Sequence, residues 1–278
     1  MSQYLYGANV HANGIRQHYL RFGGQANEKA NRDPVILIPG ITSPAVTWGF
    51  VAERLGQCFD TYVLDVRGRG LSQADSDMDY SVDAQAADVA AFAEAMGFSS
   101  FSVVGHSMGA RIAARMAHNC VNPSRIVMID PPVSGPDRRA YPSQLPWYVD
   151  SIQQSIVGMS GDDMRAFCAT WTEEQLALRA EWLHTCDERA IRASFEAFHN
   201  EDFHADLKHV TCPTLLMVAE RGGVILDEDI AEIQGLVADL ATVKVPNAGH
   251  MIPWDNEEGF YQAFGKFLGA PLPSKQGE

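Results

Sequence analysis

The chain has 278 residues, 46% of them hydrophobic and 20% charged, which is the composition of an ordinary globular protein with enough apolar side chains for a large core. Its 21 Lys and Arg residues against 35 Asp and Glu residues give a net charge of −14, and the longest basic run is the pair Arg138-Arg139. This balance argues against a nucleic-acid partner, because nucleic-acid binding needs a clustered basic face.

The five cysteines are scattered and form no C-x-x-C pair, so neither a disulfide framework nor a zinc site is expected. We therefore predict no metal and no cofactor. The amino terminus lacks the apolar block of a secretory signal, and no stretch approaches the roughly 20 apolar residues that span a bilayer. These features predict a cytoplasmic protein without a membrane partner, and they carry no signal of an oligomeric state.

Taken in chain order, the first predicted element is a hairpin around Asn13-Gly14, a favoured tight turn, with strands at 10–11 and 15–20. The β-branched run at 34–38 has no alternation, which is typical of a strand buried on both faces of a parallel sheet. Further strands and helices are predicted in alternation: strands at 61–65, 101–104, 125–129, 213–219 and 242–245, and helices at 46–55, 82–96, from 110, at 228–237 and at 256–268. This alternation predicts an α/β protein with a mostly parallel central sheet flanked by helices, and with reactive groups at the carboxyl ends of the strands.

Residues 132–210 break this alternation, because they contain aromatic residues and helix-compatible runs but no convincing strand. The runs lie at 147–157, 162–171, 173–185 and 190–199. Inserted helices commonly cover the crevice at the ends of the strands. We predict a core of residues 1–131 and 211–278 with a helical lid, residues 132–210, that carries substrate specificity. Polar segments at 23–33 and after Leu272 are predicted to be a loop and a tail.

The chain is organised around the segment where the apolar run 101–104 stops at Gly105-His106-Ser107-Met108-Gly109 and a helical segment follows. In a strand–turn–helix of the form G-x-S-x-G, the strained turn projects the serine hydroxyl, and the glycines leave room for the adjoining strand and helix. Ser107 is therefore the candidate nucleophile. The N–H of Met108 at the helix start is a candidate donor to an oxyanion.

Two other segments belong to the same crevice. Gly40, at the carboxyl end of the 34–38 strand, lets the N–H of Ile41 face it, so Ile41 is the second candidate oxyanion donor; the alternative is an ordinary Pro-Gly turn. Serine needs a base to take its proton, and His250 follows the last predicted strand, as the chain order nucleophile, acid, base requires. His250 is the candidate base.

The Pro39-Gly40 turn, the Gly105–Gly109 elbow and the pair Gly249-His250 resemble the α/β-hydrolase superfamily over nearly the whole chain. In that superfamily the acid usually follows the penultimate strand, but the corresponding segment here, 219–225, has glycine where the aspartate is expected. The superfamily's alternative route places the acid at the end of the strand after the nucleophile's helix, which is Asp130. Glu220 and Asp227 are the competing acids.

A closer resemblance, to the N-formylmaleamate deformylases of aerobic nicotinate degradation, rests on six segments: 12–21, 39–44, 130–136, 145–150, 181–186 and 247–254. It implies a serine hydrolase that cleaves the linear amide C–N bond of a small anionic substrate, N-formylmaleamate. Formate and maleamate would form through a formyl-serine and water, with no metal. The resemblance also assigns the acid to Asp130.

The carboxylate of such a substrate calls for a basic or donating group in the pocket despite the charge of −14. The candidate substrate contacts are Arg111, on the helix after Ser107, and Trp147, Tyr148, His184 and Trp254. The lid offers further basic residues, among which the sequence does not choose: Arg138, Arg139, Arg179 and His199. The rival functions are a carboxylesterase or carbon–carbon hydrolase of the same fold, and a non-catalytic ligand receptor.

Overall fold

The structure is a computed structural model that describes residues 2–24, 32–270 and 272. Most of the loop predicted at 23–33 and the tail predicted after Leu272 lie outside the described residues. The strands are β1 (Tyr4–Ala12), β2 (Ile15–Phe22), β3 (Val35–Ile38), β4 (Thr61–Leu64), β5 (Ser102–His106), β6 (Arg125–Ile129), β7 (Thr214–Ala219) and β8 (Leu240–Val245).

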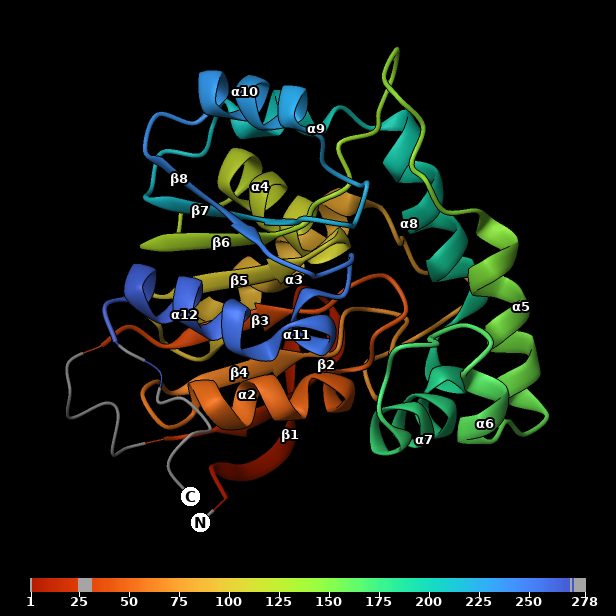
Figure 1. Ribbon diagram of the computed structural model, residues 1–278. Coiled ribbons are helices and arrows are strands. Elements are labelled where there is room, and N and C mark those ends of the chain that lie inside the picture. Colours follow the sequence, from red (N-terminus) through yellow and green to blue (C-terminus); the bar gives the residue numbers. More distant parts are fainter. Residues whose placement is uncertain (1, 25–31, 271, 273–278) are drawn as a thin grey trace.

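The eight strands form one sheet in the order β1-β2-β4-β3-β5-β6-β7-β8 (Figure 1). The hairpin strand β2 pairs antiparallel with both β1 and β4, and every other neighbouring pair is parallel. The predicted hairpin turn is confirmed: Ala12 pairs with Ile15, and the two turn residues have φ angles of 48° and 73°. Because the parallel strands point the same way, their carboxyl ends meet at one edge of the sheet.

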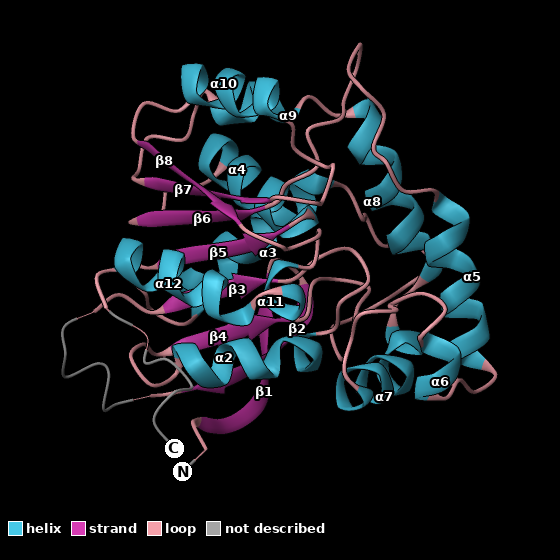
Figure 2. Cartoon of the chain, in the orientation of Figure 1, coloured by secondary structure: helices cyan, strands magenta, loops and turns pink. Residues whose placement is uncertain are grey.

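Helices cover both faces of the sheet (Figure 2). Outside the segment between β6 and β7 they are η1 (Ala45–Trp48), α2 (Gly49–Leu55), α3 (Val82–Ala95), α4 (Met108–Asn119), α10 (Asp227–Leu236), α11 (Ile252–Asp255) and α12 (Glu257–Leu268). Figure 1 shows α2, α11 and α12 in front of the sheet and α3 and α4 behind it. None of the helices in the described part of the chain is long and apolar enough to span a membrane.

Strand β3 shows how the core is built from the sequence. Val35 and Leu37 belong to an apolar cluster with Phe260 of α12. The alternate residues, Ile36 and Ile38, belong to a second apolar cluster on the other face. All four side chains of β3 are fully buried. The prediction of a strand buried on both faces is therefore confirmed.

A helical insertion separates β6 from β7, and Figure 1 shows α5 to α8 together at one side of the sheet. Its helices are α5 (Leu145–Ile156), α6 (Gly161–Met164), α7 (Glu173–Trp182), η2 (Leu183–Thr185), α8 (Glu188–Asn200) and α9 (Phe203–Leu207). The helix predicted at 162–171 was wrong beyond Met164. Cys168 and Trp171 lie in a loop there and line a cavity.

Candidate active site

Ser107 lies between the end of β5 and the start of α4, in a strained backbone conformation with φ 53° and ψ −115°. Its N–H donates to the carbonyl of Ile129 at 2.8 Å, which ties the turn to the end of β6. The flanking glycines are required by space. A Cβ on Gly109 would lie 2.0 Å from the carbonyl oxygen of Ile38, and one on Gly105 would lie 2.3 Å from that of Gly109.

The structure brings Ser107, His250 and Asp130 together from three different strand ends. The Ser107 hydroxyl lies 3.0 Å from Nε2 of His250, and Nδ1 of the same ring lies 2.7 Å from Oδ2 of Asp130. With Nδ1 protonated, the ring donates to the carboxylate and presents Nε2 as an acceptor to the serine hydroxyl. This is the arrangement in which a histidine can take a proton from serine.

Asp130 follows β6 directly and is fully buried, with a φ angle of 45°. Its Oδ1 accepts from the N–H of Ala219 at 3.1 Å, so both carboxylate oxygens have a donor. The competing acids lie elsewhere. Glu220 accepts from the N–H of Asn247, and Asp227 pairs with Lys244 at the surface.

The two candidate oxyanion donors flank the serine. Gly40 approaches Ser107 closely, since a Cβ on Gly40 would lie 3.6 Å from Cβ of Ser107. The Gly40 carbonyl accepts from Ser43 N–H at 3.2 Å, which turns the N–H of Ile41 the opposite way in the same peptide plane. Among the described residues, neither this N–H nor that of Met108 has a hydrogen-bond acceptor. Both are therefore available to a ligand.

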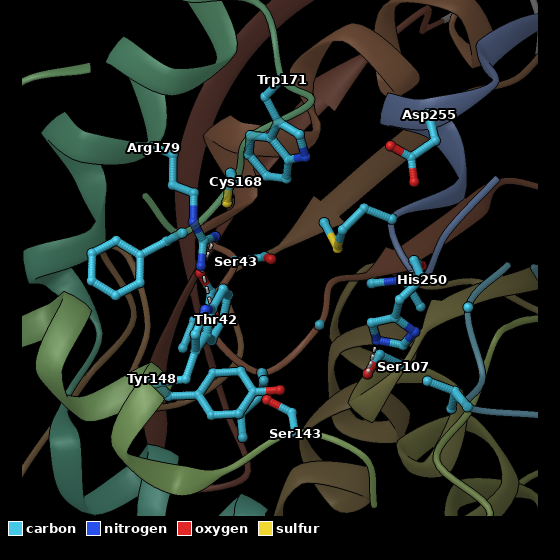
Figure 3. A pocket seen from close by; sticks show the side chains of 18 of the residues that line it. Thr42, Ser43, Ser107, Ser143, Tyr148, Cys168, Trp171, Arg179, His250 and Asp255 are labelled. Atoms are coloured by element: carbon cyan, nitrogen blue, oxygen red, sulfur yellow. Dashed lines mark hydrogen bonds between the residues drawn. The ribbon is translucent and has the colours of Figure 1, made fainter. Parts of the chain in front are cut away.

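Ser107 and His250 open onto a cavity of about 430 Å³ between the core and the helical insertion (Figure 3). The core contributes the loop at 40–43 and residues near His250. The insertion contributes, among others, Tyr141, Trp147, Tyr148, the loop 167–171 and Arg179. A cavity of this size accommodates a small molecule.

A sequence profile of the alpha/beta hydrolase family matches residues 35–263. The chain belongs to the alpha/beta hydrolase family. This confirms the fold class predicted from the sequence, and the nucleophile-bearing turn and the helix-flanked sheet are this family's architecture.

Among the curated α/β hydrolases, N-formylmaleamate deformylase of Pseudomonas putida (strain KT2440) is 63% identical over 98% of this chain and 100% of its own length. A crystal structure of an N-formylmaleamic acid deformylase from Pseudomonas putida S16, with a serine-to-alanine substitution, matches with a TM-score of 0.88 and 52% identity. That match covers 93% of this chain and 100% of the other. An esterase from Exiguobacterium antarcticum, 18% identical with a TM-score of 0.78 over 95% of this chain and 100% of its own, shares the fold.

The vacant acid position of this α/β hydrolase has a steric explanation. Gly222, after β7, is close to the site: a Cβ there would lie 2.7 Å from Cβ of Ala219, 3.1 Å from Oδ2 of Asp130 and 3.4 Å from the backbone nitrogen of His250. The carboxylate that reaches in from the end of β6 occupies this space. A glycine is therefore needed where the superfamily usually has its aspartate.

The predicted substrate contacts divide into two groups. Trp147 and Tyr148 line the cavity. Trp254 does not line it, but stacks on Trp171, which does, with ring centroids 5.0 Å apart. His184 is exposed and lies outside the cavity lining.

The expectation that Arg111 contacts the substrate is contradicted by its position. Arg111 is buried away from the cavity, and its guanidinium donates to the carbonyls of Pro132, Ser134, Ala197 and Glu201. It fastens α4 to the helical insertion. Its place in the sequence, one turn after the nucleophile, gave no information about the direction of its side chain.

Tyr141 was missed by the sequence analysis. Its hydroxyl lies 3.3 Å from Nε2 of His250, and Tyr148 donates a hydroxyl hydrogen bond to it at 3.4 Å. Burial, reinforced by neighbouring Tyr148, raises the pKa of Tyr141 well above its ordinary value, so the phenol stays protonated and able to donate. Tyr141 differs from the other tyrosines by its contact with His250, which is 109 residues away in the sequence, so no local motif marks it.

His106 contacts the backbone and the ring of His250. Its Nε2 lies 3.0 Å from the carbonyl of His250, so the ring donates there from Nε2, and the two imidazole centroids are 4.9 Å apart. Burial, with a further contribution from His250, lowers the pKa of His106 to about 3. At any pH well above 3 His106 is therefore neutral, and its hydrogen bond holds the backbone of His250.

Proposed function

We propose that this α/β hydrolase cleaves N-formylmaleamate to maleamate and formate, as a step of aerobic nicotinate degradation. The observation that carries the proposal is the 63% identity to a P. putida N-formylmaleamate deformylase over 98% of the chain. Coverage this complete includes the helical insertion, so the likeness extends to the walls of the cavity and not only to the sheet. The serine, imidazole and carboxylate described above supply the chemistry.

In the first step, His250 removes the proton of the Ser107 hydroxyl as the oxygen attacks the formyl carbon of the substrate. The 3.0 Å separation of Ser107 Oγ and His250 Nε2 supports direct transfer. Asp130 stabilises the imidazolium that forms. The oxyanion of the tetrahedral intermediate accepts from the N–H groups of Ile41 and Met108, which have no other acceptor among the described residues.

In the second step the carbon–nitrogen bond breaks and His250 returns the proton to the departing nitrogen. The second carbonyl on that nitrogen delocalises its electron pair, so maleamate leaves more readily than an alkyl amine would. Water, deprotonated by His250, then attacks the formyl-serine and releases formate. We also propose that the insertion, residues 132–210, acts as a lid that shields these steps, over a core of residues 1–131 and 211–278.

The test is to supply purified protein with N-formylmaleamate and, separately, with a simple aryl ester, and to measure formate and phenol release. We expect fast formate release, slow ester turnover and no turnover by Ser107→Ala, which controls for contaminating enzymes. Faster cleavage of the ester would identify a carboxylesterase. Binding without turnover, together with no labelling of Ser107 by a fluorophosphonate probe, would identify a receptor.

A further inference from the structure

Arg179 is a buried cation without a carboxylate partner. Among the described residues, three arginines are at most 4% exposed and form no ion pair: Arg69, Arg111 and Arg179. A buried charge is costly unless it is paired or fully hydrogen-bonded. The hydrogen-bond acceptors around each guanidinium therefore indicate whether it has donors left for a ligand.

Arg69 and Arg111 are satisfied within the protein. The guanidinium of Arg69 donates to three carbonyls, a hydroxyl and the Met108 sulfur, and that of Arg111 donates to four carbonyls. Arg179, by contrast, donates to oxygen only at Thr42, whose carbonyl and hydroxyl accept at 3.1 and 3.0 Å, and has a further side-chain contact with the Cys168 thiol. Its Nε is buried without a hydrogen-bond partner. Of the three, only Arg179 lines the cavity.

The surroundings of Arg179 hold it rigidly and leave its charge unopposed. The guanidinium lies 5.5 Å from the centroid of Trp171, which positions it by a cation–π contact. The nearby thiol of Cys168 has a pKa raised by burial, which keeps it neutral. The carboxylate that lines the cavity, Asp255, lies on the side opposite Arg179 (Figure 3) and already accepts from Gly249 N–H and the Thr170 hydroxyl.

We propose that Arg179, held by Thr42 and Trp171, is the subsite for a carboxylate at the end of the substrate remote from the reacting carbonyl. Thr42 follows Ile41 directly, so the cation lies one residue beyond the oxyanion donor. A short monoamide of a dicarboxylic acid that places its formyl oxygen at Ile41 N–H can therefore reach Arg179 with its carboxylate. Guanidinium hydrogens suit this partner because they form paired, charge-assisted hydrogen bonds with carboxylates. This inference rests on the proposed function and adds its recognition element.

The kinetic experiment compares Arg179→Met, Arg179→Lys and wild type on N-formylmaleamate and on its neutral methyl ester. Arg165→Met is the matched control, because Arg165 belongs to the same insertion but has a side chain that is 39% exposed and pairs with Glu173. We expect Arg179→Met to lower kcat/KM for the acid by about 10²-fold, mostly through KM, and to leave the methyl ester within about threefold. Arg179→Lys should retain part of the preference for the acid over the methyl ester, and Arg165→Met should retain all of it.

Equal losses on the acid and the ester would show that Arg179 only supports the Thr42 loop, and would overturn the proposal. If Arg179→Met fails to fold, as judged by circular dichroism, the wild-type enzyme still decides. Its kcat/KM must be about 10²-fold higher for the acid than for the methyl ester. Equal values for the two substrates would refute the subsite.

A binding experiment separates this inference from the proposed function. In Ser107→Ala, calorimetry with maleate and with dimethyl maleate should show binding of the dianion alone, abolished by adding Arg179→Met. Binding that depends on Arg179 in a protein whose wild type does not hydrolyse N-formylmaleamate would retain the subsite and reject the deformylase. If Arg179→Met hydrolyses N-formylmaleamate with unchanged kinetics, the deformylase is retained and the subsite is rejected.

Discussion

The carboxylate of Asp130 is buried with a donor on each oxygen, and we propose that it orients His250. Asp130→Asn should lower kcat by about 10⁴-fold, because an amide that donates to Nδ1 stabilises the wrong tautomer of the ring. The fold should survive, since the amide oxygen can still accept from Ala219. The measurement is kcat together with circular dichroism.

Glu220→Gln is the matched control for Asp130, because Glu220 was the competing acid and contacts only the N–H of Asn247 among the bonds described for its carboxylate. Its kcat should stay within about twofold of wild type. A large loss in this variant, or an active Asp130→Asn enzyme, would show that the acid has been assigned to the wrong strand.

Tyr141 should act on the departure of the leaving group. Its hydroxyl lies beside His250 Nε2, where the departing nitrogen receives its proton, so it can donate to the maleamate as negative charge develops. Tyr141→Phe should lower kcat on N-formylmaleamate about tenfold. It should affect para-nitrophenyl formate less, because nitrophenolate leaves without a proton. Equal effects on both substrates would instead assign Tyr141 to positioning His250.

These residues mark the limit of what the sequence predicts. Ser107 and His250, which the structure places 3.0 Å apart, could be proposed from the sequence because each lies on a short segment whose position relative to a strand is set locally. Tyr141 could not be found, and Arg179 could not be chosen among the basic residues of the insertion, because no periodic pattern there indicates which side chains turn inward. Arg111, on α4 of the core, was misplaced for a different reason: a position on a helix does not specify what lies opposite it.

At the scale of elements, the contact between the elbow and β3 depends on a glycine. Gly109→Ala should lower the free energy of unfolding by about 3 kcal/mol, because its Cβ would meet the Ile38 carbonyl at 2.0 Å. Gly235→Ala, in α10, is the control: among the described residues no atom beyond the adjoining backbone of its own helix lies within 4 Å of its added Cβ, so it should stabilise the protein by about 0.5–1 kcal/mol. Urea unfolding measures both, and similar values would contradict the steric argument.

The elements themselves were predicted well wherever burial imposes a pattern. The unbroken apolar run of β3 predicted a buried strand, and Asn13-Gly14 predicted a hairpin turn. Both are present in the structure. The short helices α9 and α11 were not predicted, because segments of five and four residues are too short to show a helical period. The loop after α6 was misjudged because its apolar residues line a cavity rather than one face of a helix.

For the whole molecule, the buried His106 links stability to pH. Its pKa is about 3 in the folded protein, against about 6.5 in an unfolded chain. Between these values the unfolded chain binds more protons, so the free energy of unfolding falls as the pH falls. Between about pH 6.5 and about pH 4.5 the loss that arises at His106 should be roughly 2–3 kcal/mol.

Urea unfolding across this pH window measures the effect, and the variant to compare is His106→Gln, which keeps a donor for the His250 carbonyl but does not titrate. Its stability should depend less on pH than that of wild type over the same interval. If the two proteins lose stability in parallel, the acid sensitivity arises at other groups.

The close approach of Gly222 to the Asp130 carboxylate constrains how this enzyme can diverge. The acid can follow either β6 or β7, but in both cases its carboxylate would occupy the same space beside the ring of His250. Gly222→Asp alone would force two carboxylates into it, and loss of Asp130 alone would leave none. Relocating the acid requires changes at both positions, and either change alone gives a disabled enzyme. A library built to relocate the acid must therefore vary codons 130 and 222 together.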